Sequence, residues 1–117
     1  MNYTLFGIPN CDTVKKARTW LDDKGVSFNF HNYKKDGISA EQIQHWLEQV
    51  PLKTVLNKAS ATYRKLSDIE KQQTDVEASA VALLVENPSM IKRPVLMKND
   101  DVIAVGFKPD LYESLFQ

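Results

Sequence analysis

Apolar residues follow two different rhythms in the first part of the chain. A short apolar segment, Tyr3–Phe6, stops at Gly7 and Pro9, as a β-strand does. From Thr13 onward, apolar side chains recur at helical spacing up to a glycine placed where a helix would end: Val14, Ala17, Trp20, Leu21 and Gly25. Val26–Tyr33 then alternates, which predicts a second strand. Strand, helix and strand in this order predict a parallel crossover unit.

The next part of the chain carries helix signals. Ser39 and Gln42 have the spacing of a capping box, and the apolar stripe that follows them ends at Pro51: Ile43, Trp46, Leu47 and Val50. Leu52–Leu66 has no clear period. We predict short helices and turns there.

The last part combines helix and hairpin signals. A second capping box at Ser67–Glu70 and apolar spacing from Val76 to Pro88 predict further helices. Pro94–Lys98 and Val102–Val105 flank three polar residues, which predicts a β-hairpin. Lys108–Phe116 predicts a closing helix.

These elements follow the order β-α-β, a helical block, and β-β-α. We predict an α/β fold with a thioredoxin-like mixed sheet and a helical insertion between its two halves. The 117 residues form a single domain in this interpretation, with a core at residues 1–34 and 93–117 and the insertion at residues 38–92. The first strand would lie beside the strand that begins at Pro94, so that residues distant in sequence meet.

Composition narrows the class of protein. The 43% hydrophobic and 26% charged residues are typical of a soluble globular protein. Fifteen basic and fifteen acidic residues give a formal net charge of zero, so no overall field attracts the chain to nucleic acid or to a membrane surface. No run approaches the ~20 apolar residues of a membrane span, and the first residues lack a basic leader. We therefore expect a cytoplasmic monomer with a reduced cysteine.

Cys11 is the only cysteine and lies where the first strand gives way to a helix. Unpaired backbone N–H groups and the helix dipole favour a thiolate at such a position, and Lys15 and Lys16 add positive charge. The alternative is a buried small hydrophobe, as most free cysteines are. A core cysteine fits poorly between Asn10 and Asp12, and so we favour a reactive thiol.

Other chemical candidates are weaker. His31 and His45 do not have the spacing of a metal pair, and with one cysteine no thiolate cluster forms, so we expect no metal site. Instead, His31 should lie on a strand face and His45 on a helix surface. Trp20 and Trp46 fall on helix stripes, which favours core packing over base stacking.

Arg93 and Thr13 are further candidates for binding a ligand. Arg93 lies directly before a strand, so its side chain should project from the end of the sheet, where open α/β folds bind ligands. Thr13 can donate its hydroxyl to a thiolate or an oxyanion. Helix capping by Asp12 or by Thr13 is an equal alternative.

Three segments resemble, in order, the motifs of the ArsC/Spx/YffB family, and the YffB branch is the most similar. They are Cys11–Ala17, the stretch from Asn57 through Tyr63–Leu66, and Arg93–Val95. The resemblance covers essentially the whole chain. It implies a thioredoxin-type fold in which Cys11 is the redox nucleophile.

The resemblance also implies a substrate site. Arg64 and Arg93 would converge on the thiol, because guanidinium groups bind carboxylates and oxyanions and stabilise a thiolate. Without the motif, Arg64 would be interpreted as a solvated cation. Pro94 would follow a cis peptide bond and expose backbone groups that pair with a thiol-bearing peptide such as glutathione.

The chain departs from its relatives at three positions. Lys108 stands where arsenate-reducing members carry a third arginine, and an ammonium cannot reproduce bidentate oxyanion binding. Gly7 replaces a histidine of those members, which makes arsenate a less favoured substrate. Many Spx-type regulators, which bind RNA polymerase, use a CxxC pair as a redox switch, but here Val14 takes the second position.

We therefore predict a thiol–disulfide oxidoreductase with Cys11 as nucleophile, and with Arg64, Arg93, Pro94, Thr13 and Lys108 binding the substrate. Since no second cysteine can resolve an intermediate, an external thiol must. No cofactor is expected to be bound, and the expected partners are glutathione or a protein thiol such as that of glutaredoxin. The alternatives are an arsenate reductase that uses glutathione and glutaredoxin, and an Spx-like regulator.

Overall fold

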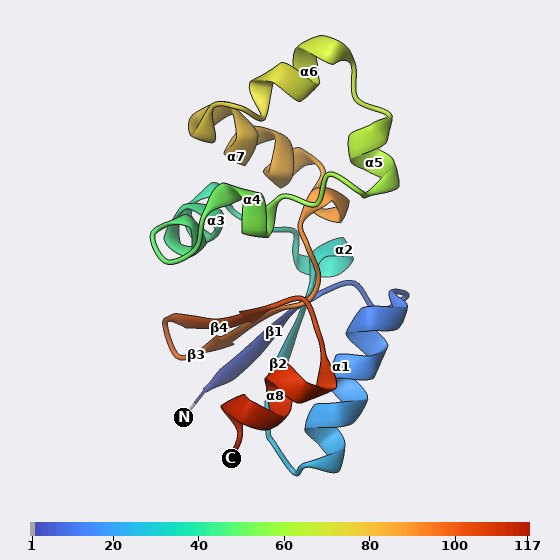
Figure 1. The fold of residues 1–117 in the computed structure, drawn as a ribbon, viewed down its shortest axis with the longest axis vertical. Coiled ribbons are helices and arrows are strands. Elements are labelled where there is room, and N and C mark those ends of the chain that lie inside the picture. Colours follow the sequence, from blue (N-terminus) through green and yellow to red (C-terminus); the bar gives the residue numbers. More distant parts are fainter. Residues whose placement is uncertain (1) are drawn as a thin grey trace. The chain divides into compact units, whose positions relative to one another are not determined.

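The computed structural model describes residues 2–117, which fold into two compact units (Figure 1). One unit combines the chain up to Asp36 with Arg93–Gln117, and the other is formed by Gly37–Lys92. The two ends of the chain therefore contribute to the same unit.

The first unit is built around a mixed sheet. Within residues 2–117 this sheet has four strands in the order β2-β1-β3-β4: β1 (Tyr3–Gly7), β2 (Asn29–Asn32), β3 (Val95–Lys98) and β4 (Asp101–Val105). β1 pairs in parallel with β2 and antiparallel with β3, and β3 pairs antiparallel with β4. The predicted α/β fold with a mixed sheet is confirmed, and so is the place of the first strand beside the hairpin.

Helices cover one face of this sheet. The unit contains α1 (Asp12–Asp23), α2 (Tyr33–Asp36) and α8 (Pro109–Leu115), and Figure 1 shows α1 and α8 alongside the strands. Leu5, Leu96 and Ala104 pair across three strands and form one buried row. The buried side chains of Ala17 and Leu21 from α1, together with Tyr112 from α8, pack in the same cluster. α1 and α8 thus share one apolar layer on the sheet.

The second strand begins later and ends earlier than the sequence predicts. β2 begins at Asn29 rather than Val26, because its ladder with β1 begins at the pair of Thr4 and Asn29. The predicted strand through Tyr33 is wrong, since Tyr33 is the first residue of α2. The Asn32 side chain explains this start, because its Oδ1 accepts a hydrogen bond from the Lys34 N–H at 2.9 Å.

The second unit is helical. Its elements are α3 (Ala40–Leu47), α4 (Leu52–Val55), α5 (Ala61–Arg64), α6 (Asp68–Gln73), α7 (Glu77–Glu86) and the 3₁₀ turn η1 (Pro88–Met90). Ser39 caps α3 by accepting from the Gln42 N–H at 3.1 Å. The capping box predicted before α6 is present in full, with Ser67 and Glu70 each accepting from the other's backbone N–H.

Pairing of distant segments closes this helical unit. Leu56 and Ile91 form an isolated antiparallel bridge, and the Lys92 N–H donates to the Val55 carbonyl at 2.7 Å. α3 packs on α7, and Trp46 of α3 is fully buried, as its place on the helix stripe predicts. Across residues 2–117, no helix combines the length and apolar character needed to cross a membrane.

Candidate functional site

One edge of the sheet collects segments from all four strands. β1 and β2 both end there, because Gly7 pairs with Asn32. β3 begins at the same edge, where Val95 pairs with Phe6 on one side and with Val105, the last residue of β4, on the other. Residues that directly follow β1, β2 and β4 or precede β3 are therefore brought to a common edge.

Most of the candidate residues lie in these segments. Cys11 follows β1, the pair Arg93 and Pro94 precedes β3, and Lys108 follows β4 as the N-cap residue of α8. Tyr33, which the sequence analysis did not single out, directly follows β2. The topology thus places a nucleophile and two cations near one edge, although they are far apart in sequence.

Cys11 is the N-cap residue of α1. Its backbone is extended, with φ −108° and ψ 125°, and its carbonyl accepts the first helical hydrogen bond from the Lys15 N–H at 2.9 Å. Cys11 makes no side-chain capping hydrogen bond, so N–H groups of the first turn remain without a cap next to this half-buried residue. An ionised sulfur accepts from such groups far better than a neutral thiol.

Arg93 and Pro94 are joined by a cis peptide bond, as the motif resemblance implies. Pro94 is buried, and its carbonyl accepts from the Gly106 N–H at 2.8 Å, which ties it to the end of β4. Arg93 lies one step outside, before the first paired residue of β3, and its side chain is half-buried. Its peptide groups therefore lie at the end of the ladder, next to the edge that carries Cys11.

Tyr33 adds a buried hydroxyl to this edge. Burial raises the pKa of Tyr33 well above its usual value, and the nearby Arg93 charge offsets part of that rise. Its ring contacts His31 at 5.9 Å, and His31 in turn lies on the strand face against Phe6. Among the residues that the structure describes, the Tyr33 hydroxyl has no hydrogen-bond partner. It stays protonated at neutral pH and is a potential donor.

Comparison with known proteins identifies one family whose model matches most of the chain. A profile of the ArsC family matches residues 6–115. The chain belongs to the ArsC family. The match includes Cys11, Arg64, Arg93 and Lys108, and so it covers the predicted nucleophile and every predicted cation of the site.

Individual members of the ArsC family show how far the similarity extends. A solved structure described as the YffB protein is 49% identical, with a TM-score of 0.88 and 96% of both chains covered. An arsenate reductase (ArsC) related protein from Brucella melitensis is 47% identical, with a TM-score of 0.77, covering 100% of this chain and 96% of that one. The global transcriptional regulator Spx of Streptococcus mutans is 31% identical over 92% of this chain and 77% of its own length. The predicted family and thioredoxin-like fold are confirmed.

The structure shows that a side chain at position 7 would clash with α1. A Cβ built on Gly7 would lie 2.8 Å from Cγ2 of Val14, which is fully buried on α1. Real Cβ atoms essentially never approach another heavy atom this closely. The histidine that the motif resemblance implies for arsenate-reducing members would meet the same clash with Val14.

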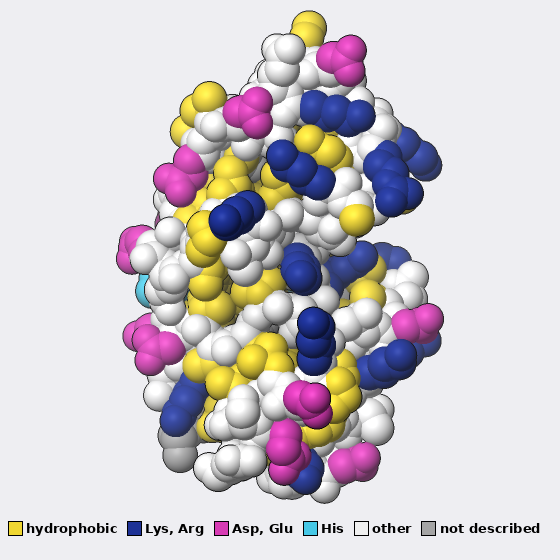
Figure 2. Space-filling model, in the orientation of Figure 1, with side chains coloured by type: hydrophobic (Ala, Val, Ile, Leu, Met, Phe, Trp, Pro, Cys, Tyr) yellow, Lys and Arg dark blue, Asp and Glu magenta, His cyan; other side chains and the backbone are white. Residues whose placement is uncertain are grey.

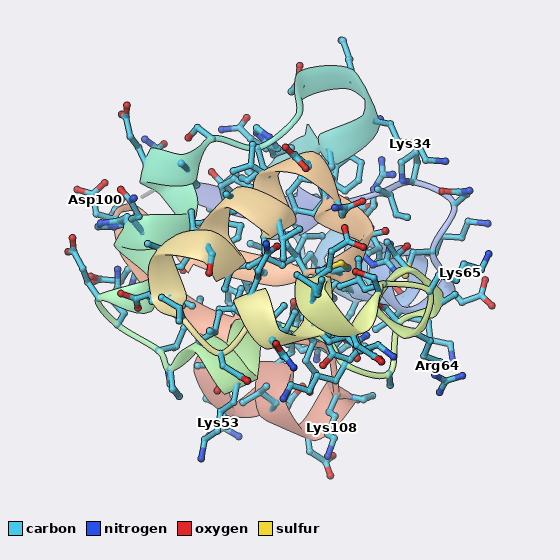
Figure 3. All side chains as sticks on the ribbon, turned by 90° about the horizontal axis from the view of Figure 1, so that it is seen from above. Lys34, Lys53, Arg64, Lys65, Asp100 and Lys108 are labelled. Carbon is cyan, nitrogen blue, oxygen red and sulfur yellow. The ribbon has the colours of Figure 1, made fainter. Side chains whose placement is uncertain are left out.

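The remaining predicted residues have different surroundings. Thr13 is the second residue of α1 and half-buried, and capping by Asp12 or Thr13 is wrong, because Cys11 occupies the N-cap position. Lys108 is exposed, and Figure 3 shows its side chain extending outward. Arg64 is the last residue of α5 in the helical unit, with an exposed side chain that also extends outward in Figure 3. Its approach to Cys11 stays a prediction.

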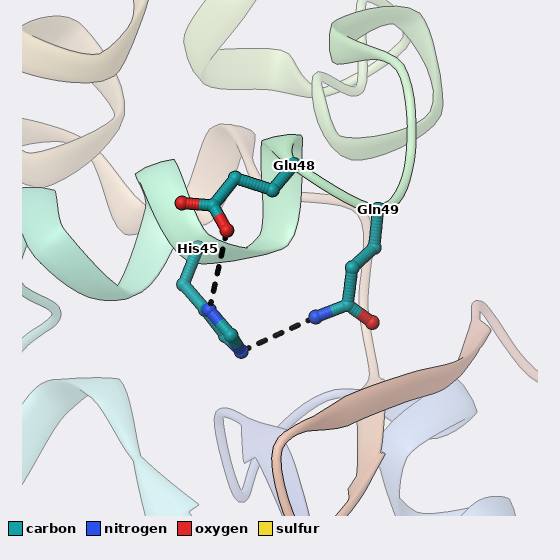
Figure 4. A network of polar contacts seen from close by, with 3 residues as sticks. All are labelled: His45, Glu48 and Gln49. Atoms are coloured by element: carbon teal, nitrogen blue, oxygen red, sulfur yellow. Dashed lines mark hydrogen bonds and ion pairs between the residues drawn. The ribbon is translucent and has the colours of Figure 1, made fainter.

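His45 has a local role on the surface of the helical unit. Its ring contacts Gln49 Nε2 at 3.2 Å and Glu48 at 3.9 Å, and Glu48 is the C-cap residue of α3 while Gln49 directly follows it (Figure 4). In residues 2–117, no three His, Cys, Asp or Glu side chains are grouped as metal ligands. This histidine is therefore best interpreted as a surface residue of the helix.

Proposed function

We propose that this ArsC family member is a thiol–disulfide oxidoreductase that uses glutathione as its co-substrate. The observation that carries the proposal is the place of Cys11 at the uncapped N-terminus of α1, on the sheet edge that also holds Arg93 and cis Pro94. A thiolate there would be an accessible nucleophile, since Cys11 is only half-buried. The 49% identity to the YffB structure supports the same site in both proteins.

The reaction needs no second cysteine in the chain. The Cys11 thiolate attacks the glutathionyl sulfur of a mixed disulfide, forms a Cys11–glutathione disulfide and releases the substrate thiolate, which takes up a proton. Reduced glutathione then loses its proton and attacks this disulfide, which gives oxidised glutathione and restores the Cys11 thiolate. In the net reaction, the mixed disulfide and one reduced glutathione give the substrate thiol and oxidised glutathione.

Arg93 supplies the recognition of the glutathionyl group. Its peptide N–H and carbonyl lie just outside the β3 ladder, where an extended peptide can continue the pairing. Its guanidinium provides forked donors for a carboxylate of glutathione and a positive charge near the sulfur. The Tyr33 hydroxyl, close to this guanidinium, is suited to hold it in place or to donate to the same carboxylate.

Two other activities of relatives fit less well. Arsenate binding would lose the histidine that Val14 excludes from position 7 and the third arginine that Lys108 replaces. The similarity to Spx supports a shared fold at 31% identity, but Val14 removes the second cysteine of a CxxC switch. Neither activity has a structural feature in its favour that the thiol reductase lacks.

Mass spectrometry of the glutathione adduct tests the proposal. The purified protein is incubated with oxidised glutathione, and its intact mass is measured before and after reduction. We expect one glutathionyl group per chain, located on Cys11 by peptide mapping and removed by excess reduced glutathione. A protein that acquires no adduct under conditions that oxidise free cysteine would overturn the proposal.

Activity assays separate the alternatives. Cys11→Ser should abolish the reduction of a glutathionylated peptide, because the hydroxyl cannot form the mixed disulfide. Turnover of arsenate in an assay coupled to glutathione and glutaredoxin would favour an arsenate reductase over the proposed thiol–disulfide oxidoreductase. Copurification with RNA polymerase that survives Cys11→Ser would favour the regulator.

A further inference from the structure

A groove runs along α1 on the side that faces the start of α8. It has a volume of about 400 Å³, and its walls come from one face of α1 and from the two residues that flank Lys108: Lys15, Lys16, Thr19, Trp20 and Asp23, with Phe107 and Pro109. It begins one helical turn after Cys11. The α1 residues that line it therefore lead away from Cys11 along the helix.

The floor of this groove is a fixed aromatic surface. Trp20 and Phe107 both contact the buried ring of Tyr112 edge-on, with centroids 5.5 and 4.7 Å apart and interplanar angles of 88° and 82°. Tyr112 is itself fully buried in the core of the sheet unit. Side chains held in this way keep their apolar faces available without rearrangement, which suits a large apolar group of a ligand.

The end of the groove near the thiol is basic. Lys15 and Lys16 are exposed on its wall. Lys108 is also exposed and lies in the sequence between Phe107 and Pro109, which line the groove. Among the described residues that line the groove, Asp23 is the one carboxylate, and it lies about 12 Å further along the helix from Lys15 at 1.5 Å per residue. Figure 2 shows basic, acidic and apolar side chains together on the face with α1 and α8, so the basic character is local to the end of the groove that Lys15, Lys16 and Lys108 form. A ligand that matches this pattern is acidic near the thiol and apolar beyond it.

We propose that this groove binds an extended, acidic and aromatic segment of a partner protein, and directs an oxidised cysteine of that segment to Cys11. Lys15 lies about 6 Å, and Trp20 about 13 Å, along the helix from Cys11. An extended peptide rises about 3.3 Å per residue, so the acidic residue falls about two positions, and the aromatic residue about four, from the reacting cysteine. The docking stands on the groove alone, and only the delivery of a cysteine rests on the proposed function.

A protein segment fits this site better than a membrane or a small thiol. With zero net charge the chain has no overall field that would hold it on an anionic membrane. Glutathione, a tripeptide, is too short to fill a groove of this length while joined to Cys11. The groove therefore distinguishes protein substrates from glutathione at the same sulfur.

Fluorescence polarisation with a labelled peptide tests the docking. The probe is an extended pentapeptide with Ser in place of the reactive cysteine, Glu at its third position and Phe at its fifth, and the protein is the Cys11→Ser variant, so that no covalent bond forms. We expect saturable binding that weakens with salt. Lys16→Glu should weaken it about fivefold or more, because a charge attraction becomes a repulsion.

Matched controls make the result specific. Lys98→Glu brings the same change of charge at the opposite end of the sheet, where Lys98 pairs with Tyr3, and should change affinity less than twofold. A probe with Ser in place of Phe should also bind more weakly, which tests the aromatic floor without altering the protein. Equal effects of the two charge reversals, or equal binding of the two probes, would overturn the proposal. Because the sulfur is absent here, the glutathione adduct of the unaltered protein can succeed or fail independently.

Discussion

The contact between Gly7 and Val14 leads to a quantitative prediction about stability. An added Cβ at Gly7 would lie 2.8 Å from Cγ2 and 3.3 Å from Cγ1 of Val14. The valine cannot rotate away easily, since β-branched side chains have one strongly preferred rotamer in a helix and Val14 is fully buried. Gly7→Ala therefore forces α1 and β1 apart, or strains the valine.

The magnitude follows from known costs of core changes. Overpacking of a core costs about 1–3 kcal/mol, from which the usual gain of Gly→Ala in the unfolded chain removes about 0.4–1 kcal/mol. We expect Gly7→Ala to lower the free energy of unfolding by about 1–2 kcal/mol. Val14→Ala alone should cost about 2–3 kcal/mol, because it removes two buried methyl groups. The double variant should cost about 1–2 kcal/mol less than the sum, since the new methyl group fills the vacated space.

Urea denaturation of the four proteins, followed by far-UV circular dichroism, measures this coupling. The three variants and the parent should have similar m-values, so that differences in midpoint report stability. Additive costs, within about 0.3–0.5 kcal/mol, would refute the steric account of Gly7. The same account predicts that Gly7→His destabilises the protein more than Gly7→Ala does.

Three further predictions concern the site and the core. Arg93→Ala should slow the transfer of a glutathionyl group to Cys11 several-fold, because the forked donors proposed to bind a carboxylate of glutathione are lost, and Arg93→Lys should restore only part of the rate; equal rates for all three proteins would remove Arg93 from the mechanism. Tyr112→Phe should leave the free energy of unfolding unchanged or raise it by about 1 kcal/mol, since it deletes a buried hydroxyl that has no partner among residues 2–117 while keeping the ring. Burial raises the pKa of both Tyr33 and Tyr112 above the value of about 10 that they have in the unfolded chain. The free energy of unfolding is therefore unaffected by these two groups below pH ~10, and above it each group lowers the free energy of unfolding by about 1.4 kcal/mol per pH unit. Tyr112→Phe should halve this alkaline slope in urea titrations at a series of pH values, and an unchanged slope would contradict the assignment.

Local signals in the sequence were sufficient for much of the fold. Capping residues such as Ser39 and Ser67 fix helix starts through hydrogen bonds three residues away, so they can be identified without tertiary information. The order of elements also predicted that the first strand pairs with the hairpin, since mixed sheets of this kind have few topologies. Tyr33 was misassigned because alternation continued through it, whereas the Asn32 side chain had already begun a helix.

Features that depend on distant contacts were not predictable in this way. The sequence identifies Cys11, Arg93 and Lys108 as candidates, and the sheet brings their segments to one edge. The exclusion of a side chain at Gly7 depends on the packing distance between a strand and a helix. The groove along α1 likewise exists only because α8, at the other end of the chain, places aromatic rings against Trp20.

The split construction of the sheet unit has a consequence for biosynthesis. A ribosome releases β1, β2 and the thiol early, but the strand that must pair with the second side of β1 emerges only after Arg93. Until then, the nascent chain exposes the unpaired edge of β1 and the Cys11 thiol. The exposed edge favours aggregation, and the exposed thiol favours oxidation. Early binding of a chaperone or a short residence on the ribosome would protect this protein at its most vulnerable stage.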